Sequence, residues 1–273
     1  LYRGHQKFHR FGLLLFIQNI LNLATLPLAI VWGFVGLLFK LVLYTFLSYH
    51  IRTKDWRDII PSNSDGLSGL FRVGGPIFIG SVLFTVIFSI DRVIIAHFFS
   101  VERLGQYAVA AQISGFFMAI ASATGLYFSP KAIACISQGE RAKEKCISYG
   151  LYSVATALIV SLPAIIFGLF FLEKFILAYA PNYIDSIEAG YAALITGLMF
   201  PLLASTFVFA VLNKSYDYLK ILIFCGLFYL FILVGLMEFE LVAEIKYVVY
   251  LKGFFVLFLG MFALIHANLL SKK

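Results

Sequence analysis

The chain has 273 residues, of which 62% are hydrophobic and 17% aromatic, while only 13% carry a charge. Soluble domains carry about 25% charged residues, so this composition leaves too little polar surface to cover a globule in water. It excludes a soluble enzyme or binding domain and predicts an all-α integral membrane protein, because helices satisfy their own backbone hydrogen bonds in lipid.

The first apolar block covers residues 11–49. This is too long for one crossing, which takes about 20 residues. Pro27 and Gly33 lie in its middle and favour a break, so two helices are expected. A polar stretch follows and is typical of a loop. The predicted organisation is 1–51 for the last two helices of one bundle, 52–73 for a cytoplasmic loop and 74–273 for a six-helix bundle.

Six further apolar stretches are each long enough to cross a bilayer, which brings the expected number of transmembrane helices to eight. Pro76 suits the first turn of the first stretch, and the second is expected to stop at Ser129 and Pro130. Pro163 and Pro201 fall inside the third and fourth, where neighbouring groups can bond the freed carbonyl. The six predicted helices cover residues 74–99, 104–128, 147–171, 186–212, 218–237 and 247–270.

The basic residues are distributed unevenly between the two sets of loops. Of the 21 Lys and Arg residues, fifteen lie in the end segments and alternate loops on one side, three in the opposite loops and three within helices. Because basic residues collect on the cytoplasmic side, both ends of the chain are expected in the cytoplasm. The net charge of +7 is therefore explained by topology, and no nucleic-acid partner is expected.

Two neighbours of opposite charge, Asp91 and Arg92, lie about 10 Å inside the end of the first of the six helices. A charge at this depth costs about 2.5 kcal/mol or more, so it normally faces protein or a wet cavity. Adjacent helical residues point about 100° apart, so each is expected to have its own partner. Arg92 either faces a cavity, where it would attract an anion, or extends to the headgroups. Asp91 either lines that cavity or, as we favour, bonds a neighbouring helix.

Other polar residues within predicted helices leave similar alternatives open. Lys40 could line the same cavity or extend toward the headgroups, and for Lys252, near a membrane surface, we expect the second. Gln18, Asn22 and Gln112 either bond between helices or contact a substrate in the cavity. The cavity candidates are thus Arg92, Lys40, Asp91, Gln18, Asn22 and Gln112.

The sequence contains no recognisable catalytic or cofactor motif. There is no GxSxG, HExxH, P-loop or glycine-rich dinucleotide fingerprint. Cys135, Cys146 and Cys225 lack the spacing of a metal site or a disulfide framework. We therefore expect no enzyme activity, no metal and no cofactor. Because the chain begins with Leu1, it is expected to be a fragment of a longer protein.

The stretch from Gly74 to Phe117 resembles the start of the second half of oligosaccharide flippases. These are Wzx-type O-antigen transporters, in the polysaccharide biosynthesis protein family of the MATE-like flippase superfamily. The resemblance is carried by Gly75-Pro76, by Asp91-Arg92 and by Gly105, Tyr107 and Ala110-Ala111, and continues through "YFSPKAIACISQGE". It implies two bundles of six helices, of which the first four helices would lie upstream.

The resemblance implies that the protein moves an undecaprenyl-diphosphate-linked oligosaccharide, an O-antigen or exopolysaccharide repeat unit, across the bacterial inner membrane by alternating access. The partners it implies are this lipid-linked sugar, membrane lipids, a proton or sodium gradient and the polysaccharide polymerase machinery. One alternative is a MATE-type cation-coupled drug antiporter, which would need buried carboxylates. Another is a membrane-embedded polysaccharide polymerase or transferase, which would need a large outer loop.

Overall fold

The computed structural model describes residues 35–36, 38–39, 42–43, 45–46, 65–136, 142–206, 216–239 and 244–271. The chain divides into two compact units, Leu1–Phe71 and Arg72–Lys273. In the first unit, the described residues before residue 50 are helical. The rest of the two helices predicted there lies outside the described residues.

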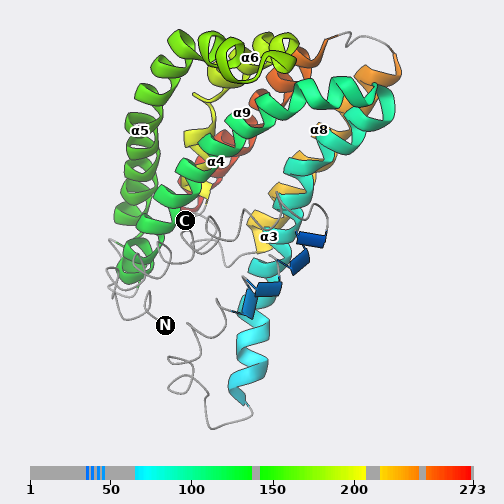
Figure 1. The fold of residues 1–273 in the computed structure, drawn as a ribbon. Coiled ribbons are helices and arrows are strands. Elements are labelled where there is room, and N and C mark those ends of the chain that lie inside the picture. The colour runs from blue at the N-terminus through cyan, green and yellow to red at the C-terminus, as the bar shows by residue number, and fades with distance from the viewer. Residues whose placement is uncertain are drawn as a thin grey trace. The chain divides into compact units, whose positions relative to one another are not determined.

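The described part of the chain is all-α and contains no strand, which confirms the predicted class (Figure 1). Five of its helices are long and apolar enough to cross a membrane, or six spans if one bent pair counts as a span. The elements in chain order are α3 (Asp65–Phe98), α4 (Val101–Ile136), α5 (Ala142–Tyr179), η1 (Pro181–Ser186), α6 (Ile187–Thr196), η2 (Phe200–Leu202), α8 (Tyr216–Glu238) and α9 (Ile245–Ser271).

Several helices are longer than the sequence predicts. α3 begins at Asp65, within the stretch expected to be a loop, and α5 continues to Tyr179. α4 runs through Pro130 to Ile136 instead of stopping there. The Ser129 hydroxyl, next to this proline, donates to the Gly125 carbonyl at 2.6 Å, and a proline is tolerated inside a membrane helix where neighbouring groups can bond the carbonyl it frees.

The stretch predicted as one helix over 186–212 is broken instead. α6 ends at Thr196, residues 197–199 form a turn, and η2 follows, so that the two parts are bent by 43°. Pro201 contributes to the break because it has no N–H for the helical ladder. Gly197 lies in the turn, where a β-carbon would be only 2.5 Å from the ring of Phe117, so the close approach of α4 requires glycine there.

α6 lies at one end of the second unit, in contact with α4, α5 and α9 (Figure 1). Six of its ten residues are buried, four of them Ala or Gly, and such small residues let membrane helices approach closely. Gly253 of α9 shows how tight the packing is, since a β-carbon there would be 2.5 Å from Thr196. In Figure 1, α4 and α9 run alongside one another, with α5 on one side and α8 on the other.

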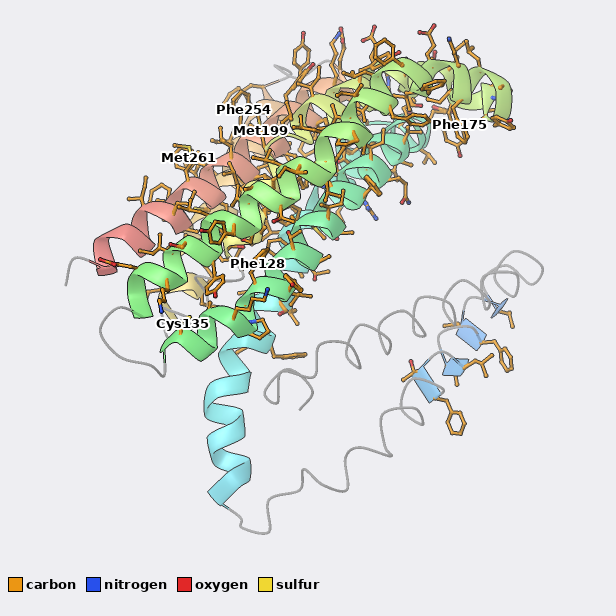
Figure 2. All side chains as sticks on the ribbon, turned by 90° about the vertical axis from the view of Figure 1, so that its left-hand side faces the viewer. Phe128, Cys135, Phe175, Met199, Phe254 and Met261 are labelled. Atoms are coloured by element: carbon orange, nitrogen blue, oxygen red, sulfur yellow. The ribbon has the colours of Figure 1, made fainter. Side chains whose placement is uncertain are left out.

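The outside of this unit is largely apolar. Phe175 and Phe254, both labelled in Figure 2, are 60% and 58% exposed. Large exposed hydrophobic side chains are unfavourable in water but are the expected surface of a protein solvated by lipid tails.

Candidate functional site

A buried ionic cluster joins α3, α4 and α9. The Lys252 Nζ atom donates to Asp91 Oδ2 at 2.6 Å, to the Phe88 carbonyl at 3.0 Å and to the Tyr107 hydroxyl at 3.4 Å. The Tyr107 hydroxyl donates to Asp91 Oδ2, and the Arg92 backbone N–H donates to Asp91 Oδ1 at 2.8 Å. Asp91 is 0% exposed and Lys252 is 5% exposed. We call Asp91, Tyr107, Lys252 and the Phe88 carbonyl the ionic cluster.

The cluster forms because its members lie at the same depth. Asp91 is seven residues before the end of α3, Tyr107 is six residues after the start of α4, and Lys252 is seven residues after the start of α9. α3 and α4 are joined by the short turn at residues 99–100, so these two depths are measured from the same end of the unit. A helix rises about 1.5 Å per residue, so the side chains meet about 10 Å from the helix ends.

Every charged group in the cluster has partners. An ammonium carries three N–H donors, and Lys252 has three acceptors within reach. Both oxygens of Asp91 accept at least one bond. Such saturation matters, since a buried ion pair only compensates for its lost hydration when the remaining lone pairs and protons are bonded. The Asp91–Lys252 pair as a whole contributes no net charge.

The position of Lys252 corrects the sequence-based expectation that it extends to the headgroups. Its side chain points inward, because Asp91 and the Phe88 carbonyl at the same depth are stronger partners than the distant membrane surface. Of the two separate partners that the sequence predicts, the structure shows the one for Asp91, which pairs with Lys252 and not with the Arg92 guanidinium. Asp91 bonds two neighbouring helices and, being fully buried, does not line an open cavity in this structure.

Arg92 stands in a different environment from its neighbour. It is exposed, and within the described part of the chain its guanidinium forms no ion pair or hydrogen bond. It lies six residues, or about 9 Å, inside the end of the apolar segment Phe78–Phe98. A cation at this depth is unfavourable against hydrocarbon, so Arg92 either faces a wet or ligand-filled space or extends toward the headgroups, the two alternatives that the sequence leaves open.

Arg92 belongs to a polar stripe on the exposed face of α3. Helical residues at i, i+4, i+8 and i+11 share one face. Ser81, Thr85, Ser89 and Arg92 have this spacing, and all four are exposed. The Thr85 hydroxyl bonds back to the Ser81 carbonyl at 2.9 Å. We call these four residues the α3 polar stripe.

α4 also presents an exposed face that contains a polar residue. Gln112 is exposed there, and most of the residues around it on the same face are small. The exposed neighbours of Gln112 on this face are Ala108, Gly115, Phe116, Ala119 and Ala123. The other three cavity candidates, Lys40, Gln18 and Asn22, lie outside the described residues. Of the remaining three, Asp91 and Arg92 are consecutive on α3, and Gln112 lies on α4, the helix whose Tyr107 bonds Asp91.

A family described as polysaccharide biosynthesis protein matches residues 5–188. The chain belongs to this polysaccharide biosynthesis protein family. The match includes Asp91, Arg92, Tyr107 and Gln112 but ends before Lys252. No curated protein and no solved structure gives a significant match to the chain.

In this polysaccharide biosynthesis protein the residues that sequence reasoning missed are Lys252 as a partner of Asp91, and Tyr107 as the hydroxyl that joins them. The signal was present as two opposite charges, each about two turns inside its helix. Among the described residues no group of His, Cys, Asp and Glu could hold a metal ion.

Two buried tyrosines allow a matched test of the cluster. Tyr107→Phe removes the hydroxyl that bonds Asp91, and should lower the free energy of unfolding by about 1.5–3 kcal/mol, as for hydrogen bonds to charged groups. Tyr229→Phe is the control, because the Tyr229 hydroxyl is buried without a hydrogen-bond partner in the described structure. Unfolding of both purified variants in mixed detergent would measure the difference, and equal stability would contradict the bonding described for Tyr107.

Proposed function

We propose that this polysaccharide biosynthesis protein translocates an undecaprenyl-diphosphate-linked oligosaccharide, an O-antigen or exopolysaccharide repeat unit, from the cytoplasmic to the outer leaflet of the bacterial inner membrane. The observation that carries the proposal is Arg92 at membrane depth on the α3 polar stripe, where it is exposed and has no ion-pair partner among the residues that the structure describes. A diphosphate is the anionic group of such a lipid, and a guanidinium binds phosphate oxygens through its planar fork of N–H donors.

The physical difficulty of this translocation is the sugar, because moving each hydroxyl from water into hydrocarbon without a hydrogen-bond partner costs about 2–7 kcal/mol of free energy. The α3 polar stripe offers hydroxyl groups along several turns of one face, and Gln112 adds an amide on the neighbouring helix. The sugar would cross along these faces while its lipid tail stays in the bilayer.

The whole cycle would be that of a Wzx-type flippase with a MATE-like fold. Two bundles would rock around the substrate and open alternately to each side. Both ends of this chain would lie in the cytoplasm, as the basic residues predict. A proton or sodium gradient would supply the energy, the polymerase machinery would receive the product, and the protein itself would perform no covalent chemistry.

The ionic cluster argues against the alternative of a cation-coupled drug antiporter. A cationic drug needs a carboxylate with charge to spare, but Asp91 is buried and already neutralised by Lys252. Among the described residues, the cation next to this pair in the sequence is Arg92, which would repel such a drug. No observation in the described residues favours the polymerase or transferase alternative.

Translocation can be tested with the purified protein in phosphatidylcholine vesicles that contain undecaprenyl diphosphate linked to an oligosaccharide with terminal galactose. Galactose oxidase added outside oxidises only the outward-facing lipid. In protein-containing vesicles nearly all of the terminal galactose should become oxidised, whereas in protein-free vesicles only the half in the outer leaflet should. Equal protection in both would contradict the proposal, and uptake of ethidium by the same vesicles would instead support the drug antiporter.

A further inference from the structure

The net charge that an anion would meet at Arg92 depends on Lys252, which is not part of the α3 polar stripe. Asp91 and Arg92 are consecutive, so an ionised Asp91 without Lys252 would lie one residue from the guanidinium. Charges this close in a medium of low dielectric constant are weakly screened, and an approaching anion would be affected by both. Their sum would be close to zero.

The structure removes this cancellation through Lys252. Its Nζ atom is 2.6 Å from Asp91 Oδ2, inside the bundle, where the side chain of Lys252 is only 6% exposed. The remaining acceptors of Lys252, the Phe88 carbonyl and Tyr107 hydroxyl, hold it on the side of Asp91 that faces α9 and α4. Arg92 is exposed on α3, and the bond that links it to Asp91 comes from its backbone N–H.

We infer that Lys252 is a positioning residue that sets the charge preference of the translocation path, because it neutralises Asp91 and leaves Arg92 to attract an anion. Lys252 would not contact the substrate. This inference rests on the proposed function, since it assigns Arg92 to the substrate path. It explains why Asp91 can stand directly next to Arg92 in the sequence although Arg92 is proposed to attract an anion.

The experiment compares two probes that share a tail and differ in charge, farnesyl diphosphate and farnesol, bound to the purified protein in phosphatidylcholine nanodiscs. Lys252→Met should weaken binding of the diphosphate by about tenfold or more, since Asp91 then opposes Arg92, and should leave farnesol binding unchanged. The double variant Asp91→Asn/Lys252→Met should restore the diphosphate affinity. A purely structural role of Lys252 would instead weaken both probes together.

The outcomes separate this inference from the proposed function. If the unmodified protein binds both probes equally, the anionic path and this inference both fail. If it prefers the diphosphate but Lys252→Met keeps the preference, only this inference fails. Should Lys252→Met not fold, Asp91→Asn is tested instead. This variant keeps the charge of Lys252 without the opposing charge of Asp91, so it should bind the diphosphate more tightly than the double variant does. Equal affinities in those two variants would overturn the role of Lys252.

Discussion

Replacing Asp91 with leucine is expected to lower the free energy of unfolding by about 3–5 kcal/mol, the range found when one partner of a buried ion pair is removed. The loss arises because Lys252 would remain buried with a charge and without a counter-ion. The Tyr107 hydroxyl would lose its acceptor as well. Unfolding of the purified protein at increasing concentrations of a denaturing detergent would measure the change.

The double variant Asp91→Leu/Lys252→Met should regain most of this stability, because apolar side chains of similar volume often replace a buried pair without loss. The control is the exposed pair of Glu188 and Lys246, whose atoms approach to 3.0 Å. Glu188→Gln should change stability by less than about 1 kcal/mol, as is usual for surface pairs. If Asp91→Leu were as mild as Glu188→Gln, the buried pair would not hold the three helices together.

Replacing Arg92 with glutamine should reduce translocation of the lipid-linked oligosaccharide by about tenfold or more, since a charge-assisted hydrogen bond contributes about 1.5–3 kcal/mol. Arg92→Lys should retain part of the activity, because it keeps the charge but loses the planar fork. Arg92→Glu should be the least active, because it repels the diphosphate. Thermal stability should change little in all three, since Arg92 is exposed and unpaired in the described structure.

Arg103→Gln is the matched control for this series. Arg103 is also an exposed arginine, but it lies in the first turn of α4 and bonds Gln106 at 3.3 Å. Its loss should leave translocation in the vesicle assay unchanged. Normal transport by Arg92→Gln would remove Arg92 from the substrate path, whereas equal losses in both arginine variants would indicate a general effect of surface charge.

Much of the fold could be predicted because long apolar stretches leave the backbone few alternatives to a helix. The stretches at 218–237 and 247–270 correspond closely to α8 and α9. The break after α6 was missed because Pro130 and Pro163 stand inside continuous helices, so a proline alone does not show where a membrane helix ends. The difference at Pro201 lies in its surroundings, where α4 approaches the turn at Gly197.

The site was predicted less completely than the fold. The depth of Asp91, Arg92 and Lys252 follows from counting residues, but the direction of each side chain does not. These helices are apolar on most of their circumference, so hydrophobic periodicity does not show which face meets another helix. Lys252 was therefore expected to reach for the headgroups, although a carboxylate lay at its own depth. Matching opposite charges by depth would have joined it to Asp91.

The ionic cluster also has a mechanical consequence. It fastens one point on each of α3, α4 and α9 at a single level, and any sliding of these helices past one another would strand charges in hydrocarbon. In any conformational change of this unit, α3, α4 and α9 should therefore move together as one body. Flexibility would have to come from segments that the cluster does not hold, so spin labels placed on α4 and α9 near Tyr107 and Lys252 should keep a constant separation.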